Sequence, residues 1–154
     1  MNHQQFVQLV DVEIDTIPLQ EKLSDPDVGA HGWFYGVTRR TTVLNRTADF
    51  PEEKITQTLS YEAHRSMALK QLKNLAQRAA DQFELKNIVI VHRLGEVPIG
   101  QASVVVGCSS AHRVATFRAL EWIMKVLKKD VPIWKQESYA DGTTEWVHPV
   151  DSGK

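Results

Sequence analysis

ALKQLKNLAQRAADQFELKNIVIVHR, residues 68–93, is the stretch of sequence that decides the fold. Its first part carries a single apolar stripe with the spacing of a helix, so it predicts an amphipathic helix through Phe83. The stripe consists of Ala68, Leu72, Leu75, Ala76, Ala79 and Phe83. Its second part, Asn87–Arg93, is a β-branched run that predicts a buried strand. Helix and strand together indicate a layered α and β domain.

Toward the C-terminus the same two patterns recur. A second β-branched run, Gln101–Cys108, predicts a neighbouring strand, reached through the turn residues Gly95, Pro98 and Gly100. Ser109 or Ser110 is expected to cap a second long helix. One side of that helix is apolar, with Phe117, Leu120, Met124 and Leu127. Pro132 ends it, and residues 133–147 predict a hairpin that turns at Asp141-Gly142.

Toward the N-terminus, strands are expected over 6–14, 32–39 and 54–62, with a short helix over 18–23. Gly36 indicates a bulge or a close backbone approach within its strand. Residues 40–53 lose all periodicity and predict a surface loop. The whole order predicts the α+β class, with a mixed or antiparallel sheet and two main helices.

The composition is that of one globular domain spanning residues 1–154, with a flexible tail expected over 149–154. The chain is 42% hydrophobic, and its net charge of -1 gives no general attraction to nucleic acid or membranes. A single cysteine, Cys108, excludes an internal disulfide and a multi-cysteine metal site. Neither a signal peptide nor a membrane span is evident, so we expect a cytoplasmic protein.

Phosphate-binding glycine motifs and paired metal-binding histidines are missing, so neither a cofactor nor a metal is expected. The notable feature is a local excess of positive charge between His112 and Lys135. Its cations are Arg113, Arg118, Lys125, Lys128, Lys129 and Lys135, opposed by Glu121 and Asp130. Strand alternation puts Lys135 and Ile133 on one face and Trp134 on the other face. A lysine on the same face as a core residue favours a pocket around Lys135.

Three further groups of residues have both a structural and a chemical interpretation. Cys108 ends a hydrophobic strand, where a buried filler is the better interpretation and a nucleophile the weaker one. His92 is interpreted as a hydrogen-bonded histidine at a strand end. His112-Arg113 begins a predicted helix, where anion binding and simple packing are equally consistent with the pattern.

Six groups of residues, in order and at compatible spacing, make the chain resemble the large, catalytic subunit of molybdopterin synthase. They are Phe34-Tyr35-Gly36-Val37-Thr38-Arg39, Leu59-Ser60-Tyr61-Glu62-Ala63, Val91-His92-Arg93-Leu94-Gly95-Glu96, Ser110-Ala111-His112-Arg113, Lys128 with Pro132-Ile133-Trp134-Lys135-Gln136-Glu137, and Asp141-Gly142 with Trp146. The chain departs from the family pattern at Thr38, where valine is usual, and in a longer loop after Arg39.

The resemblance implies an α/β hammerhead fold and a sulfurtransferase of molybdenum-cofactor biosynthesis. Such enzymes convert cyclic pyranopterin monophosphate to molybdopterin with sulfur carried as a thiocarboxylate on the C-terminal glycine of a small ubiquitin-like subunit. Two large subunits form a homodimer within a heterotetramer. The matching positions imply Lys128 as the leading catalytic residue and Lys135 as its companion. The implied substrate contacts are Val37, Thr38, Arg39, His112, Arg113, Lys128, Lys135, Gln136 and Glu137, with Phe34 and Trp134 as pocket walls.

Two other functions are compatible with the residues. The basic cluster would also suit a non-catalytic module that binds a phosphorylated metabolite or RNA. A hydrolase that uses Cys108 or His112 is the third interpretation, and it requires activity without a protein partner.

Overall fold

The computed structural model of the chain describes residues 4–44 and 46–147, so the expected tail over 149–154 lies outside the described residues. The helices are α1 (Ile17–Gln20), the short 3₁₀ helix η1 (Glu21–Leu23), α2 (Arg65–Phe83) and α3 (Arg113–Asp130). The strands are β1 (Gln4–Val10), β2 (Ala30–Val37), β3 (Thr41–Leu44), β4 (Glu52–Ala63), β5 (Asn87–Arg93), β6 (Gly95–Pro98), β7 (Ala102–Ser110), β8 (Ile133–Tyr139) and β9 (Thr144–Val147). The predicted α+β class with two main helices is confirmed.

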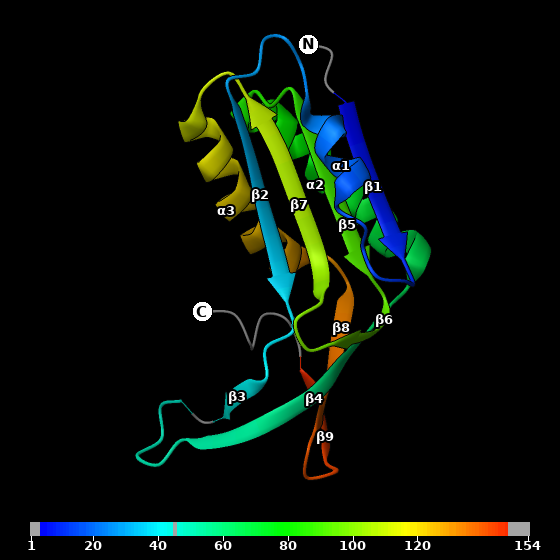
Figure 1. The fold of residues 1–154 in the computed structure, drawn as a ribbon, viewed down its shortest axis with the longest axis vertical. Coiled ribbons are helices and arrows are strands. Elements are labelled where there is room, and N and C mark those ends of the chain that lie inside the picture. The colour runs from blue at the N-terminus through cyan, green and yellow to red at the C-terminus, as the bar shows by residue number, and fades with distance from the viewer. Residues whose placement is uncertain (1–3, 45, 148–154) are drawn as a thin grey trace.

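The first sheet has the strand order β1-β5-β7-β2 and is mixed, because β1 and β5 are parallel while the other pairs are antiparallel. Helices α2 and α3 cover one face, and α1 with η1 lies on the other (Figure 1). Alternation along β5 divides the core: Ile88 and Ile90 pack toward α2 and α3, whereas Val89 and Val91 pack toward Leu23 of η1. A strand covered on both faces needs a continuous apolar run, which explains the unbroken run from Ile88 to Val91 in β5.

The second sheet is antiparallel and lies beyond the end of the first sheet at which β2 and β5 finish (Figure 1). Its order is β3-β4-β8-β9, and β6 pairs with a further part of β4. The predicted hairpin is confirmed as β8 and β9, with Gly142 at a φ of 87° in the turn. The long strand β4 leads directly into α2, so the two sheets share a continuous backbone connection.

The structure corrects three boundaries predicted from sequence. Residues 40–53 are not a loop throughout, because they contain β3 and the first residues of β4. The first strand ends at Val10 rather than at residue 14. Neither Ser109 nor Ser110 caps α3, since both belong to β7 and the N-cap is His112. Within the described part of the chain, no helix is long and apolar enough to cross a membrane.

Candidate active site

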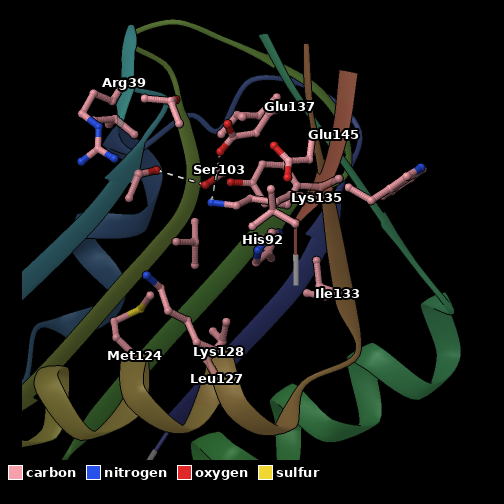
Figure 2. A pocket seen from close by; sticks show the side chains of 18 of the residues that line it. Arg39, His92, Ser103, Met124, Leu127, Lys128, Ile133, Lys135, Glu137 and Glu145 are labelled. Carbon is pink, nitrogen blue, oxygen red and sulfur yellow. Dashed lines mark hydrogen bonds and ion pairs between the residues drawn. The ribbon is translucent and has the colours of Figure 1, made fainter. Parts of the chain in front are cut away.

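A cavity of about 840 Å³ lies where the C-terminal half of α3 meets the ends of β2 and β7 and the antiparallel sheet. Figure 2 shows its charged side chains converging from several elements. The polar and charged lining includes Arg39, Arg46, Tyr61, His92, Ser103, Lys128, Lys135, Glu137 and Glu145. Its apolar lining includes Phe34, Met124, Leu127 and Ile133. Cavities of this size hold small organic ligands, and the excess of cations over carboxylates favours an anionic one.

Lys128 and Lys135 enter the cavity from different elements. Lys128 is in the last turn of α3, which ends where Val131 donates its backbone N–H to Leu127 O at 3.1 Å, just before Pro132. The chain then turns into β8, which carries Lys135. Figure 2 shows both ammonium groups pointing into the cavity. The end of α3 at Asp130, between Lys128 and Lys135, therefore brings cations from a helix and a strand to one site.

The predicted alternation along β8 is confirmed. Ile133 is buried at 4% exposure and lines the cavity, whereas Trp134 is 44% exposed on the opposite face. Lys135 follows on the cavity side with its side chain only 19% exposed. A lysine that shares a face with core residues is thus held at the cavity wall rather than in open solvent.

Arg39 is directed to the cavity by a bulge in β2. The register of β2 against β7 shifts between Gly36 and Val37, as the glycine suggested. A Cβ atom at Gly36 would lie 2.8 Å from the Val104 side chain, so only glycine fits there. Arg39 Nε then donates to Thr41 O at 3.0 Å, which fixes the start of the guanidinium beside the cavity.

The environment of Lys135 favours its neutral form more than water does. Burial lowers the pKa of Lys135 most strongly, and Lys128 and Arg39 lower it further. Glu137 acts in the opposite direction, with its Oε1 3.9 Å from Lys135 Nζ. Lys135 therefore has a pKa below its ordinary value of 10.5 while remaining next to a carboxylate.

The floor of the cavity is uncharged. His92 is buried and its Nδ1 pairs with Arg93 O at 2.9 Å, so the prediction of a hydrogen-bonded strand-end histidine is confirmed. Burial lowers the pKa of His92 to about 4, which keeps the ring neutral near pH 7. Tyr61 meets this ring edge-on at 5.2 Å, and burial raises the pKa of Tyr61. Ser103 completes the floor and donates to Gly36 O at 3.2 Å.

Six of the residues that the sequence analysis expected at the active site line this one cavity. They are Phe34, Val37, Arg39, Lys128, Lys135 and Glu137. Thr38, Gln136 and Trp134 do not line it, and Thr38 is buried with its hydroxyl donating to Val97 O at 3.0 Å. The threonine that departs from the family pattern thus serves the packing of β6.

His112 and Arg113 lie away from this cavity, at the opposite end of α3 from Lys128. Fifteen residues of helix separate Arg113 from Lys128, which corresponds to about 22 Å along the axis. One chain on its own does not bring these two groups together.

Several lining residues were missed by sequence reasoning. Glu145 is paired with Glu137 across the β8–β9 ladder, a pairing that follows once Asp141-Gly142 is taken as the centre of the hairpin. Leu44, Arg46 and Thr47 line the cavity, beside the pairing of β3 with the first residues of β4, where the sequence predicted only a loop. Ser103 gave no signal beyond its place on a strand, and Tyr61 entered only as a member of the Leu59–Ala63 group, with no role assigned to it.

Cys108 is fully buried between the sheet and α3, and its thiol donates to Thr116 O at 3.6 Å. Burial raises the pKa of Cys108 to about 12. The prediction of a buried filler is confirmed, and this geometry gives no support to a nucleophilic role for Cys108.

The chain matches the family model described as MoaE protein over residues 9–130. It is 38% identical over 126 residues to the molybdopterin synthase catalytic subunit of Emericella nidulans, covering 82% of this chain and 60% of that protein. It is 42% identical to the subunit of the same name from Neosartorya fischeri, with 82% of this chain and 62% of that protein covered. The chain therefore spans about three fifths of the length of these relatives.

Solved structures agree with the sequence relatives. Molybdopterin synthase from Staphylococcus aureus superimposes with a TM-score of 0.77 at 30% identity, covering 90% of this chain and 94% of that one. Molybdopterin cofactor biosynthesis protein E from Burkholderia multivorans gives a TM-score of 0.74 at 28% identity, covering 97% of this chain and 92% of that one. By family model, sequence relatives and fold together, the chain belongs to the MoaE protein family.

Proposed function

We propose that the chain is the catalytic subunit of a molybdopterin synthase, a sulfurtransferase that converts cyclic pyranopterin monophosphate to molybdopterin. The convergence of Lys128, Lys135 and Arg39 on one cavity carries this proposal, because these are the positions that the family resemblance marks as catalytic or substrate-binding. The relatives named above are molybdopterin synthase catalytic subunits, which supports the same assignment.

The charges of the cavity suit this reaction. The substrate has a cyclic phosphate and the sulfur donor is an anionic thiocarboxylate, so two negative groups must approach each other. Fixed cations reduce that repulsion, and they act more strongly in a partly dehydrated cavity than in bulk water. Arg39 offers the forked donors that suit a phosphate, and Lys128 lies across the cavity from it (Figure 2).

The role of the two lysines follows from their surroundings. Lys135 has a lowered pKa, so it exchanges a proton more readily near neutral pH than an ordinary lysine. Lys128 is in the last turn of α3, where a positive charge complements the negative end of the helix dipole. In this proposal Lys128 stabilises the developing anion beside the reacting carbon, and Lys135 assists it by proton transfer.

The proposed partner is a small ubiquitin-like subunit whose thiocarboxylated C-terminal Gly-Gly enters the cavity. Phe34, Met124 and Leu127 provide apolar walls against which an extended tail can pack. A structure from Helicobacter pylori with the same fold, at 21% identity and a TM-score of 0.68, is described as a complex of subunits 1 and 2 of molybdopterin-converting factor. The proposed assembly is a homodimer of this chain with one small subunit on each copy.

The homodimer also gives His112 and Arg113 a place in the proposed site. Both residues are expected to contact substrate, yet they lie about 22 Å from Lys128 along α3, estimated from the helical rise. A second copy can bring its own Arg113 to the cavity of the first. Each complete site would then combine Lys128 and Lys135 of one chain with the helix start of the other.

Reconstitution tests the proposal directly. The purified chain, a thiocarboxylated small subunit and pyranopterin monophosphate should together form molybdopterin, and omission of the small subunit should prevent it. A chain that binds the phosphorylated pterin but transfers no sulfur under these conditions would support the non-catalytic anion-binding module instead. Turnover without any protein partner would support the hydrolase.

A further inference from the structure

Two glutamates face each other directly across the β8–β9 ladder beside the cavity. Glu137 of β8 is paired with Glu145 of β9, and both line the cavity. Like charges at directly opposed positions of an antiparallel pair destabilise it. Glu137 is in addition 7% exposed, so water solvates its charge poorly, whereas Glu145 is exposed to solvent. Two carboxylates in this arrangement need a hydrogen-bond donor close to both of them.

Tyr139 is that donor. Its side chain is 2% exposed, and its hydroxyl lies 2.7 Å from Glu137 Oε2 and 3.2 Å from Glu145 Oε2. A phenol has one proton to donate, and the shorter contact assigns the stronger hydrogen bond to Glu137. Burial, and then the hydrogen bond to Glu137, raise the pKa of Tyr139, so the phenol stays protonated and remains a donor. The ring is held from the other side by Lys54, whose Nζ is 4.9 Å from its centroid.

The hydrogen bond from Tyr139 leaves the second oxygen of Glu137 for Lys135. With Oε2 held by the phenol, Oε1 faces Lys135 Nζ at 3.9 Å (Figure 2). The other charged or titratable groups that line the cavity near Lys135 include Lys128 of α3, Arg39 after β2, Tyr61 of β4 (its pairing partner), His92 of β5 and Glu145 of β9. Among the charged groups that shift the pKa of Lys135, the carboxylate of Glu137 is the one that favours the charged lysine.

We propose that Tyr139 is a positioning residue for Lys135: its phenol fixes Glu137 in the rotamer that balances the cations of the cavity. The contacts from Tyr139 to Glu137 and from Glu137 to Lys135 therefore set how easily Lys135 gives up its proton. The importance of the pKa of Lys135 for sulfur transfer rests on the proposed function. The contacts among Tyr139, Glu137 and Lys135 do not depend on that function.

A double-mutant cycle read by NMR tests the proposal. The ionisation midpoint of Lys135 is followed in the ¹³C-lysine-labelled chain, with its signal assigned by Lys135→Arg. Tyr139→Phe removes one oxygen and keeps the ring, and it should lower the midpoint because Glu137 is no longer held toward the lysine. Glu137→Gln should lower it as well. In the Glu137→Gln background, Tyr139→Phe should add no further change, because the phenol acts only through that carboxylate.

Tyr35→Phe is the matched control, since Tyr35 is 43% exposed on β2 and its loss of a hydroxyl should leave the midpoint unchanged. A midpoint that does not fall in Tyr139→Phe, or that falls equally in both backgrounds, overturns the proposal. If Tyr139→Phe does not fold, the wild-type chain provides the test: the Tyr139 hydroxyl proton should exchange slowly and show a nuclear Overhauser effect to Glu137, and absence of that contact overturns the proposal. These titrations need neither substrate nor partner, so they succeed or fail independently of the proposed enzyme activity.

Discussion

Lys128 and Lys135 act on each other across the cavity. Burial is the main reason that the pKa of Lys135 is lowered, and the positive charge of Lys128 lowers it further. The two lysines come from the end of α3 and from β8, so the break at Pro132 determines their approach. Removal of the charge of Lys128 should therefore raise the pKa of Lys135.

Lys128→Ala should lower sulfur transfer on the order of a hundredfold or more, because a fixed cation beside the developing anion would be lost. Lys129→Ala is the matched control: Lys129 is the next residue of α3 and does not line the cavity. Rates from the reconstituted reaction, with circular dichroism to verify folding, provide the measurement. Full activity of Lys128→Ala would remove this lysine from the mechanism.

Mixing two inactive variants should restore activity if Arg113 serves the cavity of the second copy. In a dimer of one Arg113→Ala chain and one Lys128→Ala chain, one of the two sites keeps both native residues. Random exchange of subunits puts half of all dimers in this mixed form, so about a quarter of the wild-type activity should return. If both residues instead serve one chain, every site carries a defect and the mixture remains inactive.

The sequence predicted the elements whose evidence is local. The stripe through α2 and the β-branched runs of β5 and β7 are short-range patterns, and the lysine approach depends on one proline between neighbouring elements. The strand β6 was missed because Gly95 and Pro98 are typical of turns, while its pairing with β4 is a long-range contact. The position of Arg113 could not be predicted from the local excess of positive charge. Arg113 and Lys128 belong to the same charged stretch of sequence, but they lie at opposite ends of a long helix and are far apart in space.

Acid should destabilise the chain through His92. The pKa of this histidine is about 4 in the folded chain and 6.5 when unfolded, because burial disfavours the charged ring. Near pH 7 the ring is neutral in both states. As the pH falls from 6.5 toward 4 the unfolded state takes up a proton first, so stability is lost in that window. The contribution to the free energy of unfolding at pH 4.5 is about 2 to 3 kcal/mol below that at pH 7.

Urea unfolding at the two pH values measures this loss. His92→Gln should reduce the difference in unfolding free energy between pH 7 and pH 4.5, because the buried titrating ring is gone. His31→Gln, which removes an exposed histidine on β2, should leave the difference unchanged. Equal pH dependence in wild type and His92→Gln would contradict the assigned role of this ring.

Cys108 should be unreactive in the folded chain and dispensable for sulfur transfer. Its thiol is fully buried, and with a pKa of about 12 only about one in ten thousand is thiolate at pH 8. A thiol-specific chromogenic disulfide reagent should therefore modify it only after denaturation. Cys108→Ala should keep the reconstituted activity. Rapid labelling of the native protein, together with loss of activity in the alanine variant, would instead support a nucleophilic cysteine.

The length of the partner's tail should be as important as any residue of this chain. The proposed donor carries its thiocarboxylate on the last glycine, so that atom must reach Lys128 after the tail has passed the walls formed by Phe34 and Leu127. Extending the tail by one or two residues should block transfer, because misplacement of a reacting carbon by about an ångström can reduce the rate on the order of a hundredfold.

Shortening the tail by two residues should have the same effect on the rate. Binding of the two proteins, measured by calorimetry, should change far less than the rate in both tail variants, since most of the docking surface remains. A donor with the same number of tail residues but alanine at the third position from the end serves as the length-matched control and should retain measurable transfer. If the extended donor transfers sulfur at the normal rate, the tail does not end beside Lys128, and this lysine loses its proposed place next to the thiocarboxylate.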